Sequence, residues 1–276
     1  MSFWDGKRVA ITGGGSGIGK ALGRALAAAG ARVSLSDVNG DAASAAAREI
    51  GGDTEGVALD VTDAQAVAAH IDGIVEARGG IDVVFNNAGI GVGGDLRELN
   101  LSHFDRSLDV NVRGVVHGIV AAFPHMKAQG SGILVNTASA AGLLPIPLMA
   151  PYAMSKHAVV GLGNSLRFEA AEHGIQITTL CPTAIETPLL ETEVSRELGA
   201  SWRPDLRTYL TRIGGPPYPV DRFVAYALRE IERGRAVIVA PRGARFRLGV
   251  ARIFPSLVER LTRTAYHEML QTRPND

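Results

Sequence analysis

The amino-acid sequence predicts an α/β protein in which seven parallel strands form one doubly wound sheet with helices on both faces. Short apolar runs alternate with alanine-rich segments along most of the 276 residues, which is the order expected of repeated strand–helix units. The runs lack the alternating polar residues of a half-exposed strand, so both of their faces are expected to be buried. A parallel sheet covered by helices satisfies both observations.

The expected elements follow one another in a regular order. The first three strands are KRVAIT (7–12), ARVSLSD (31–37) and TEGVALDV (54–61), with helices at 17–30, 40–50 and 63–79. Next come IDVVFNNAG (81–89), a long helix over about 102–129, SGILVNTAS (131–139) and a helix over 152–174. The last elements are IQITTLCP (175–182), a helix near 220–233 and AVIVAP (236–241).

Two segments depart from this order. Residues 189–218 mix charged residues with Trp202 and Tyr209 and close with a Gly/Pro cluster, so we expect an excursion outside the sheet that covers a substrate site. The tail over 242–276 is rich in arginine and is expected to be irregular up to Pro255, with a helix-like segment after it. No linker or repeat divides the chain, which predicts one domain over residues 1–276 with a C-terminal extension at 242–276.

Composition excludes several classes of partner and site. Lysine plus arginine (28) balances aspartate plus glutamate (28), so no overall field favours nucleic acid or an anionic surface. The single Cys181 and the absence of Cys/His spacing predict neither a disulfide framework nor a metal site. The N-terminus lacks a signal-peptide pattern, and the longest uncharged stretch is short and contains prolines. We therefore expect a cytoplasmic protein without a membrane span.

The glycine cluster lies where a nucleotide phosphate can bind. ITGGGSGIGKALG places Gly13, Gly17 and Gly19 between the first strand and the first helix, where the backbone can approach a pyrophosphate at the helix N-terminus. Ser16 and Ile18 lie in the same loop and are expected to contact the cofactor as well. A tight turn alone would not require the acidic residue that ends the second strand. The two features together predict a Rossmann-type dinucleotide-binding domain.

The acidic residue at the end of the second strand favours NAD over NADP. Asp37 can accept hydrogen bonds from both ribose hydroxyls of adenosine, and its charge repels a 2′-phosphate. No lysine or arginine stands in the glycine loop or directly after Asp37. Asp60 and Val61, at the end of the third strand, are expected to face the adenine. Alternatively, each of the two aspartates could simply cap the helix that follows it.

Five motifs in this order resemble the short-chain dehydrogenase/reductase family, in its compact single-domain branch. They are TGGGSGIG (12–19), NNAG (86–89), NVRG (111–114), Ser139 and the pair Tyr152-x-x-x-Lys156. Each is weak alone, because a tyrosine and a lysine four residues apart usually lie on an ordinary helix surface. The resemblance covers residues from about 6 to 241 and implies hydride transfer between an alcohol or ketone and a nicotinamide.

The resemblance also implies roles for individual residues. Tyr152 transfers the proton. Lys156, together with the positive oxidised nicotinamide ring, lowers the pKa of its phenol, and Lys156 also bonds the nicotinamide ribose. Ser139 holds the substrate oxygen, while Asn111 anchors a water that connects Lys156 to solvent. These residue types suit the chemistry, because a phenol with an ordinary pKa of about 10 is too weak a base at neutral pH without a nearby positive charge.

Further cofactor contacts follow from the same resemblance. Asn87, Ala88 and Gly89 would line the adenosine and ribose side, although a simple strand-end turn is the alternative. Residues 182–187 match the segment that holds the nicotinamide carboxamide, through Pro182, Ile185 and Thr187. The sequence departs from the family by carrying Thr183 where glycine is usual, which leaves the turn and the pocket shape open.

Two other functions are compatible with parts of this pattern. A dinucleotide-binding sensor or scaffold would be expected to have lost Tyr152, Lys156, Ser139 or Asn111, and all four are present. An epimerase or dehydratase of the extended branch would have a different glycine spacing and a larger C-terminal domain. The main interpretation is therefore an NAD-dependent dehydrogenase or reductase.

Substrate and assembly are constrained less strongly. The loop AAGLLPIPLMAP (140–151) together with Leu189 and Leu190 indicates an apolar pocket for a bulky lipophilic secondary alcohol or ketone. Trp202 and Tyr209 could extend its walls, whereas Arg196, Arg203, Arg207 or Arg212 could turn inward to meet an acidic group. The helices at 102–129 and 152–174 carry apolar stripes that predict a homotetramer or at least a dimer.

Overall fold

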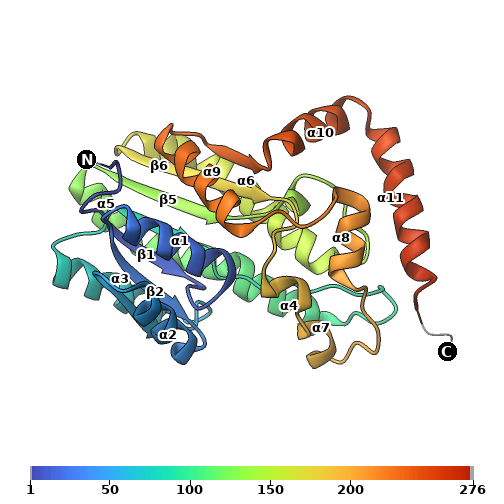
Figure 1. The fold of residues 1–276 in the computed structure, drawn as a ribbon, viewed down its shortest axis with the longest axis horizontal. Coiled ribbons are helices and arrows are strands. Elements are labelled where there is room, and N and C mark those ends of the chain that lie inside the picture. Colours follow the sequence, from blue (N-terminus) through green and yellow to red (C-terminus); the bar gives the residue numbers. More distant parts are fainter. Residues whose placement is uncertain (1, 274–276) are drawn as a thin grey trace.

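Seven parallel strands form a single sheet in the computed structural model, which describes residues 2–273 apart from the side chains of residues 247, 252, 255 and 257 (Figure 1). The strand order is β3-β2-β1-β4-β5-β6-β7. The strands are β1 (Arg8–Thr12), β2 (Arg32–Asp37), β3 (Thr54–Ala58), β4 (Val83–Asn86), β5 (Gly132–Thr137), β6 (Ile175–Pro182) and β7 (Val237–Ala240). This confirms the fold class that the sequence predicts.

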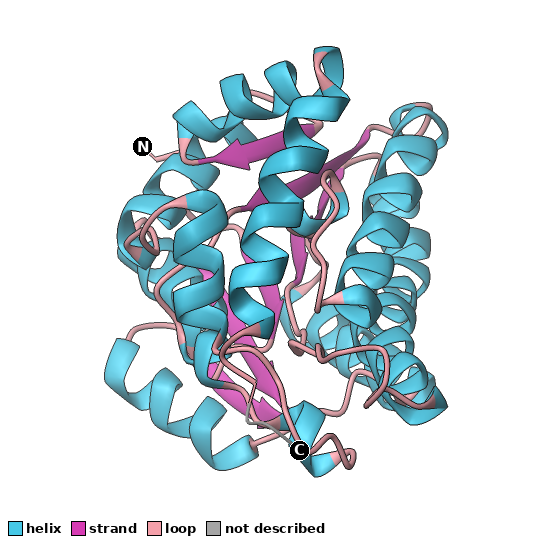
Figure 2. Cartoon of the chain, turned by 90° about the vertical axis from the view of Figure 1, so that its right-hand side faces the viewer, coloured by secondary structure: helices cyan, strands magenta, loops and turns pink. Residues whose placement is uncertain are grey.

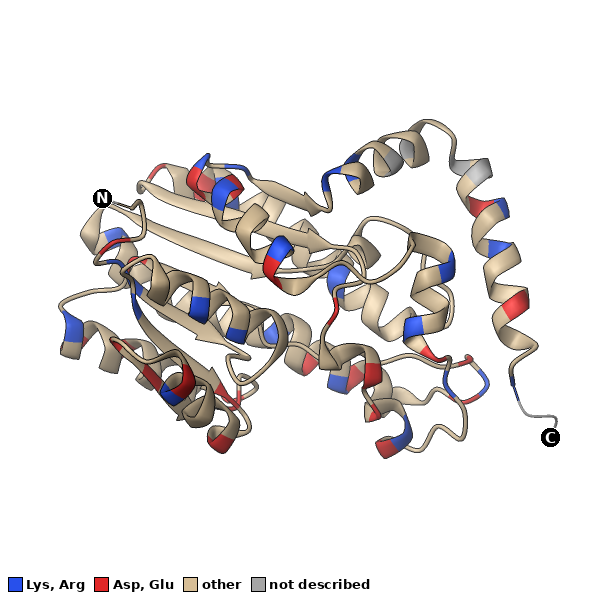
Figure 3. Ribbon diagram, viewed as in Figure 1, with Lys and Arg blue, Asp and Glu red and all other residues tan. Residues whose placement is uncertain are grey.

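Helices cover both faces of the sheet, and Figure 2 shows the strands enclosed between them. One apolar core joins the sheet to α1 (Gly17–Ala28), α2 (Gly40–Ile50) and α9 (Val220–Glu232). The other joins it to α3 (Ala64–Arg78), α5 (Gly114–Gln129) and α6 (Ala150–Ala171). Strands β4 to β7 contain no charged residue (Figure 3), because both of their faces are buried.

The strand order reverses between β1 and β4, and this reversal positions the site. Val9 of β1 pairs with Val33 of β2 on one side and with Val83 of β4 on the other. The crossovers from these strands leave in opposite directions, so a crevice opens beyond their carboxyl ends. The glycine loop after β1 and the turn after β4 both lie at this crevice.

The structure corrects two expectations about helices. The helix expected over 102–129 is α4 (Leu101–Leu108) and α5 joined through a π-helical turn, η1 (Asp109–Arg113). The tail is helical from its start, since α10 (Arg242–Ile253) directly follows β7, and α11 (Pro255–Leu270) succeeds it. The arginines and glycines of α10 obscured its inward stripe of Ala244, Leu248 and Ala251, which recurs at helical spacing.

The excursion over residues 189–218 contains η3 (Pro188–Glu191), α7 (Val194–Glu197) and α8 (Leu206–Gly214), while η2 (Ala140–Gly142) follows β5. Figure 1 shows α8 and α11 beside each other at the end of the molecule where the strands β4 to β6 terminate. Within residues 2–273, none of the helices is both long enough and apolar enough to cross a bilayer.

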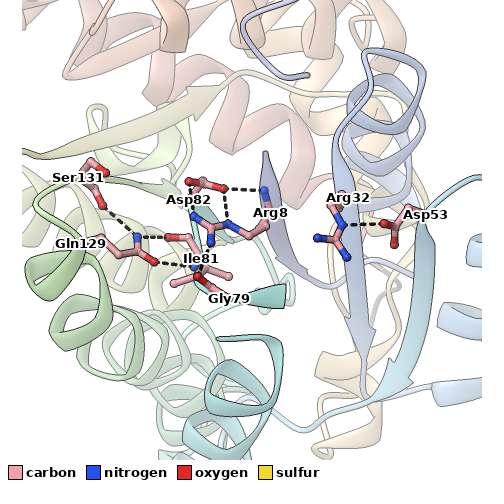
Figure 4. Close-up of polar contacts among 8 residues, drawn as sticks. All are labelled: Arg8, Arg32, Asp53, Gly79, Ile81, Asp82, Gln129 and Ser131. Carbon is pink, nitrogen blue, oxygen red and sulfur yellow. Dashed lines mark hydrogen bonds and ion pairs between the residues drawn. The ribbon is translucent and has the colours of Figure 1, made fainter. Parts of the chain in front are cut away.

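Polar contacts hold the amino ends of the strands together, at the edge opposite the crevice (Figure 4). The Arg8 guanidinium donates to both carboxylate oxygens of Asp82, at 2.7 and 2.9 Å, and the Arg8 backbone N–H donates to the same group. The Gln129 side chain bonds both the N–H and the C=O of Ile81. Burial raises the pKa of Asp82, but hydrogen bonds from Arg8 outweigh it and lower the pKa overall. The charged pair thus sets the position of β1 against β4.

We expect Asp82→Ala to lower the free energy of unfolding by about 2 kcal/mol, because the Arg8 guanidinium and backbone N–H lose their acceptor in a partly buried position. Glu259→Ala is the control: it removes the exposed pair with Arg263 and should cost no more than about 0.5 kcal/mol. Urea titration of both variants measures the difference. Equal losses would contradict this role for Asp82.

Candidate active site

The glycine loop is pressed tightly against the turn that follows β4. Gly13 has a φ of +66°, and a Cβ at this position would lie 2.9 Å from the Ala88 Cα. A Cβ on Gly19 would collide with the Gly13 carbonyl oxygen. Only glycine fits these two positions. The loop therefore presents Ser16, Gly17 and Ile18 to the main cavity of the protein, while Gly19 is buried behind them.

The N-terminus of α1 is suited to an anion. Ser16 occupies the N-cap position, but its side chain makes no capping hydrogen bond. The first N–H groups of α1 therefore have no side-chain acceptor and point toward the cavity end that Ser16 and Gly17 line. This local geometry fits the pyrophosphate of a dinucleotide.

Asp37 ends β2 and lines the same end of the cavity. Its carboxylate accepts hydrogen bonds from the backbone N–H groups of Gly15 and Asn39, each at 3.0 Å. The N-cap of α2 is Asn39, so the capping alternative for Asp37 is wrong. Among the described residues that line the cavity near Asp37, none is lysine or arginine.

The turn after β4 is held by a residue that the sequence analysis did not select. The Thr12 hydroxyl accepts from the backbone N–H groups of Asn87 and Ala88, both at 3.0 Å, and the Asn87 side chain donates back to the Thr12 carbonyl. Asn87, Ala88 and Gly89 all line the cavity. In the sequence, the signal for this role is a threonine directly before the glycine loop.

Asp60 and Val61 do not line the cavity in the described structure. Asp60 accepts from the backbone and hydroxyl of Thr62, while Asp63 caps α3, so the capping alternative for Asp60 is wrong as well. Val61 is buried and lies close to Gly114, at the start of α5. Contact with the adenine remains a prediction for these two residues.

Asn111 lies in the π-helical turn between α4 and α5 and is fully buried. Its side chain accepts from the Ile90 N–H at 2.8 Å and donates to the Ile90 carbonyl and to the Ser155 hydroxyl, each at 3.0 Å. The site therefore contains a helix irregularity of the kind that often marks functional positions. Sequence periodicity could not show it, because one inserted residue barely changes the apolar pattern.

Tyr152, Ser139 and Lys156 meet at the centre of the cavity. The Ser139 hydroxyl hydrogen-bonds the Tyr152 phenol and accepts from the Ala141 N–H at 3.1 Å. The Lys156 ammonium donates to the Thr137 carbonyl at 2.8 Å and lies 5.6 Å from the centre of the Tyr152 ring. One turn of α6 separates the two side chains, so both reach the cavity from the same helix face.

Burial governs the protonation of this group. Desolvation raises the pKa of the Tyr152 phenol, and the hydrogen bond with Ser139 only partly opposes it. Desolvation lowers the pKa of Lys156 to about 8, and burial raises that of the neighbouring Cys181 thiol to about 12. Lys156 is not among the groups that shift the pKa of Tyr152 here, and its expected effect together with an oxidised nicotinamide ring stays a prediction.

The segment after β6 closes the cavity against the glycine loop. Pro182, Ile185 and Thr187 line the cavity, and Thr187 lies against Gly17. Among the described non-glycine residues only Leu148 has a positive φ, so Thr183 occupies its position without backbone strain. Leu148 lies in the loop before α6, where its carbonyl accepts from the Gly94 N–H at 2.8 Å.

Beyond Tyr152 the cavity, about 900 Å³ in total, continues into an apolar compartment. Its walls include Ile146, Met149, Leu210, Ile213, Leu248 and Val258. Leu189 and Leu190 line it as expected. Trp202 and Tyr209 are instead buried in an apolar cluster with Met149 and Met269, and the Tyr209 hydroxyl donates to the Pro147 carbonyl at 2.8 Å.

The four arginines of the excursion each form an ion pair with a carboxylate, and Arg196 shares Glu193 with Arg203. Arg203 pairs with Glu193, and Arg207 pairs with Glu186. Arg212 borders the cavity but forms an ion pair with Glu268 of α11. Across the part of the chain that the structure describes, no cluster of three histidine, cysteine, aspartate or glutamate residues could hold a metal ion.

Comparison with known proteins assigns the family. A family model described as short chain dehydrogenase matches residues 7–198. A 2,5-dichloro-2,5-cyclohexadiene-1,4-diol dehydrogenase of Sphingobium indicum is 37% identical over 225 residues, 81% of this chain and 86% of that protein. A levodione reductase of Leifsonia aquatica is 40% identical over 194 residues, covering 68% of this chain and 73% of that protein. A short chain dehydrogenase/reductase from Burkholderia phymatum, crystallised with NAD, has a TM-score of 0.83 and 30% identity, covering 100% of this chain and 99% of that one.

The chain therefore belongs to the short-chain dehydrogenase/reductase family. It is an oxidoreductase that transfers a hydride between CH–OH groups and a nicotinamide dinucleotide. The glycine loop, the uncapped N-terminus of α1 and the three central side chains lie at positions that suit this chemistry. The sensor or scaffold alternative is not favoured.

The low pKa of Lys156 has a consequence for stability. Between about pH 8 and pH 10 the unfolded chain holds a proton that the folded protein has lost, so this group makes the free energy of unfolding rise with pH. We expect wild type to gain about 1 kcal/mol relative to Lys156→Met between pH 8 and pH 9. Denaturant titrations across this range measure the gain.

Lys127→Met serves as the control, since Lys127 is exposed near the end of α5, and it should keep the wild-type pH profile. A constant difference between wild type and Lys156→Met over the same range would show that the buried ammonium does not titrate there.

Proposed function

We propose that the protein is an NAD-preferring dehydrogenase or reductase of uncharged lipophilic secondary alcohols or the corresponding ketones. The observation that carries the proposal is that the Tyr152 and Ser139 hydroxyls lie where the dinucleotide end of the cavity meets its apolar compartment. The related dehydrogenase from Sphingobium indicum is named for a cyclic diol, which is consistent with a substrate of this kind.

Ser139 and Tyr152 would hold the substrate oxygen between their hydroxyls, with the carbon skeleton in the apolar compartment. Tyr152 would take the proton from the alcohol or return it to the ketone. A bound nicotinamide would supply or accept the hydride, and its oxidised form would add positive charge to the site. Lys156, held by the Thr137 carbonyl, adds to the field that stabilises the phenolate once that ring is present.

Lys156 and Asn111 would provide the path by which the proton reaches solvent. A Cβ on Gly89 would lie 3.4 Å from the Lys156 Nζ and 3.1 Å from the Asn111 Oδ1, so both groups flank Gly89. The Asn111 side chain is already used in hydrogen bonds to Ile90 and Ser155. The water of the relay would therefore bind the main-chain carbonyl of the π-helical turn rather than the Asn111 amide.

The preference for NAD is supported by the setting of Asp37. Two backbone N–H groups fix its carboxylate, and the described cavity lining offers no basic side chain nearby to bind a 2′-phosphate. The remaining proposed cofactor contacts are those from the glycine loop, residues 87–89, Pro182, Ile185 and Thr187. We also propose a dimer or tetramer formed through α5 and α6, where Val120 and Phe168 are 65% and 63% exposed.

We expect kcat/KM with NAD to be at least about tenfold higher for a cyclic or aryl secondary carbinol than for a short hydroxy acid or a polyol. Burying about 100 Å² more apolar surface contributes roughly 2.5 kcal/mol, which is enough for that ratio. Steady-state kinetics on such a panel measures it. Greater efficiency on either polar substrate would refute the substrate class.

Tyr152→Phe is the control for the chemistry in the same assay. It should reduce turnover of the best carbinol by roughly a thousandfold because the proton transfer is lost, while dinucleotide affinity stays near the wild-type value. Wild-type turnover in this variant would show that another group moves the proton.

Asp37→Ala should narrow the difference in affinity between NAD and NADP, because it removes both the ribose acceptor and the charge that repels a 2′-phosphate. Calorimetric titration of wild type and variant with each dinucleotide measures the two affinities. Asp41→Ala, which changes an exposed carboxylate in the first turn of α2, is the matched control and should leave the ratio unchanged. Tighter binding of NADP than NAD by wild type would overturn the cofactor assignment.

A further inference from the structure

The segment 242–263 has a charge unlike that of the rest of the chain. It contains six arginines and one glutamate, whereas the whole protein is balanced. Arg263 pairs with Glu259, but within the described residues no carboxylate lies within ion-pair distance of Arg242, Arg245 or Arg260. The segment spans α10 and the first half of α11 and lies outside the residues 7–198 that match the family model.

Large apolar side chains are exposed on the same segment. Phe246 is 77% exposed, Ile253 71%, Phe254 56% and Leu261 63%. On α10 the residues Arg242, Arg245, Phe246 and Ile253 recur at the spacing of one helix face, so basic and apolar side chains share it. Figures 1 and 3 show α10 and α11 at the outer edge of the molecule, with basic residues at the start of α10.

The apolar compartment of the active site opens beside this surface. Phe246 and Leu261 are largely exposed, and both also line the cavity. The inward stripe of α10 includes Leu248 and Ala251, which line the cavity as well. Leu248 and Ala251 thus help to close the compartment, and Phe246 and Leu261 lie at its mouth. Ile253, Phe254 and the arginines at 242 and 245 do not line the cavity.

We propose that residues 242–263 dock on an anionic lipid bilayer. The arginines would meet the headgroup phosphates, and Phe246, Ile253, Phe254 and Leu261 would enter the boundary between headgroups and acyl chains. This docking needs no transmembrane span, and it does not depend on the enzyme's substrate. If the proposed function also holds, docking places the mouth of the apolar compartment at the layer in which lipophilic substrates dissolve.

Two other occupants fit the surface less well. Two copies of the chain related by a twofold axis would place this arginine-rich surface against itself, which like charges oppose. Nucleic acid would be attracted by the arginines, but a phosphate backbone leaves four large exposed apolar side chains without a partner. An anionic bilayer satisfies both the charges and the apolar side chains.

The experiment is co-sedimentation of the full chain with vesicles. Vesicles of phosphatidylcholine alone are compared with vesicles in which about a third of the lipid is phosphatidylglycerol. We expect the bound fraction to rise about tenfold or more with the anionic lipid and to fall again in about 0.5 M NaCl, because salt screens the arginines. Equal binding to the two kinds of vesicle, or no binding to either, would overturn the proposal.

Two variants separate the electrostatic and apolar contributions. The double variant Arg242→Glu/Arg245→Glu should reduce binding to the anionic vesicles about tenfold or more. Ile253→Ser/Phe254→Ser should also reduce it severalfold; neither of these side chains lines the cavity. The matched control Arg48→Glu/Arg229→Glu makes the same change in charge at exposed positions of α2 and α9 and should bind as wild type does.

Light scattering of the protein without vesicles tests whether a second copy of the chain, instead of a bilayer, covers this surface. If Ile253→Ser/Phe254→Ser lowers the oligomeric state of the lipid-free protein, the surface is an interface between subunits and the bilayer proposal is wrong. If the control variant loses vesicle binding as fully as Arg242→Glu/Arg245→Glu, binding depends on the overall charge of the protein and not on residues 242–263, and the proposal is wrong. Neither measurement uses turnover, so a failed substrate panel does not bear on this result.

Discussion

The contact between the glycine loop and the turn after β4 is the constraint on which the whole site depends. The loop can approach that turn because Gly13 and Gly19 carry no side chain, and any Cβ there would meet the Ala88 backbone or the Gly13 carbonyl. Thr12 locks the arrangement by accepting from two backbone N–H groups of the turn. The N-terminus of α1 and residues 87–89 are thereby brought to one crevice, at the point where the strand order reverses.

The central side chains are placed at a cost in stability. Lys156 is 3% exposed, and its pKa falls from an ordinary value of 10.5 to about 8. Holding it protonated at neutral pH costs roughly 3 kcal/mol, since each pKa unit corresponds to about 1.4 kcal/mol. The Lys156 ammonium donates a hydrogen bond to the Thr137 carbonyl in this buried position. Strongly shifted pKa values of buried groups are typical of functional sites, where the charge takes part in the chemistry.

The protein consists of a sheet with its glycine loop and of a second group of segments that encloses the apolar compartment. The sheet, with its polar contacts at the amino ends, and the glycine loop form one part. The excursion and the helices α10 and α11 enclose the apolar compartment, and the Arg212–Glu268 ion pair joins α8 to α11.

The sequence by itself predicted the parallel sheet, the succession of its strands along the chain, and the three side chains Ser139, Tyr152 and Lys156 that the structure brings to one cavity. These features have local signals: apolar runs mark buried strands, glycines mark close backbone approach, and the spacing of Tyr152 and Lys156 follows the helix turn. Tertiary structure alone decided the π-helical turn at Asn111, the burial of Trp202 and Tyr209, the absence of Asp60 and Val61 from the cavity lining and the folding of the tail into α10. Each of these depends on which distant segment packs against the residue, and the free energy of that packing is not encoded in the residue's immediate neighbours.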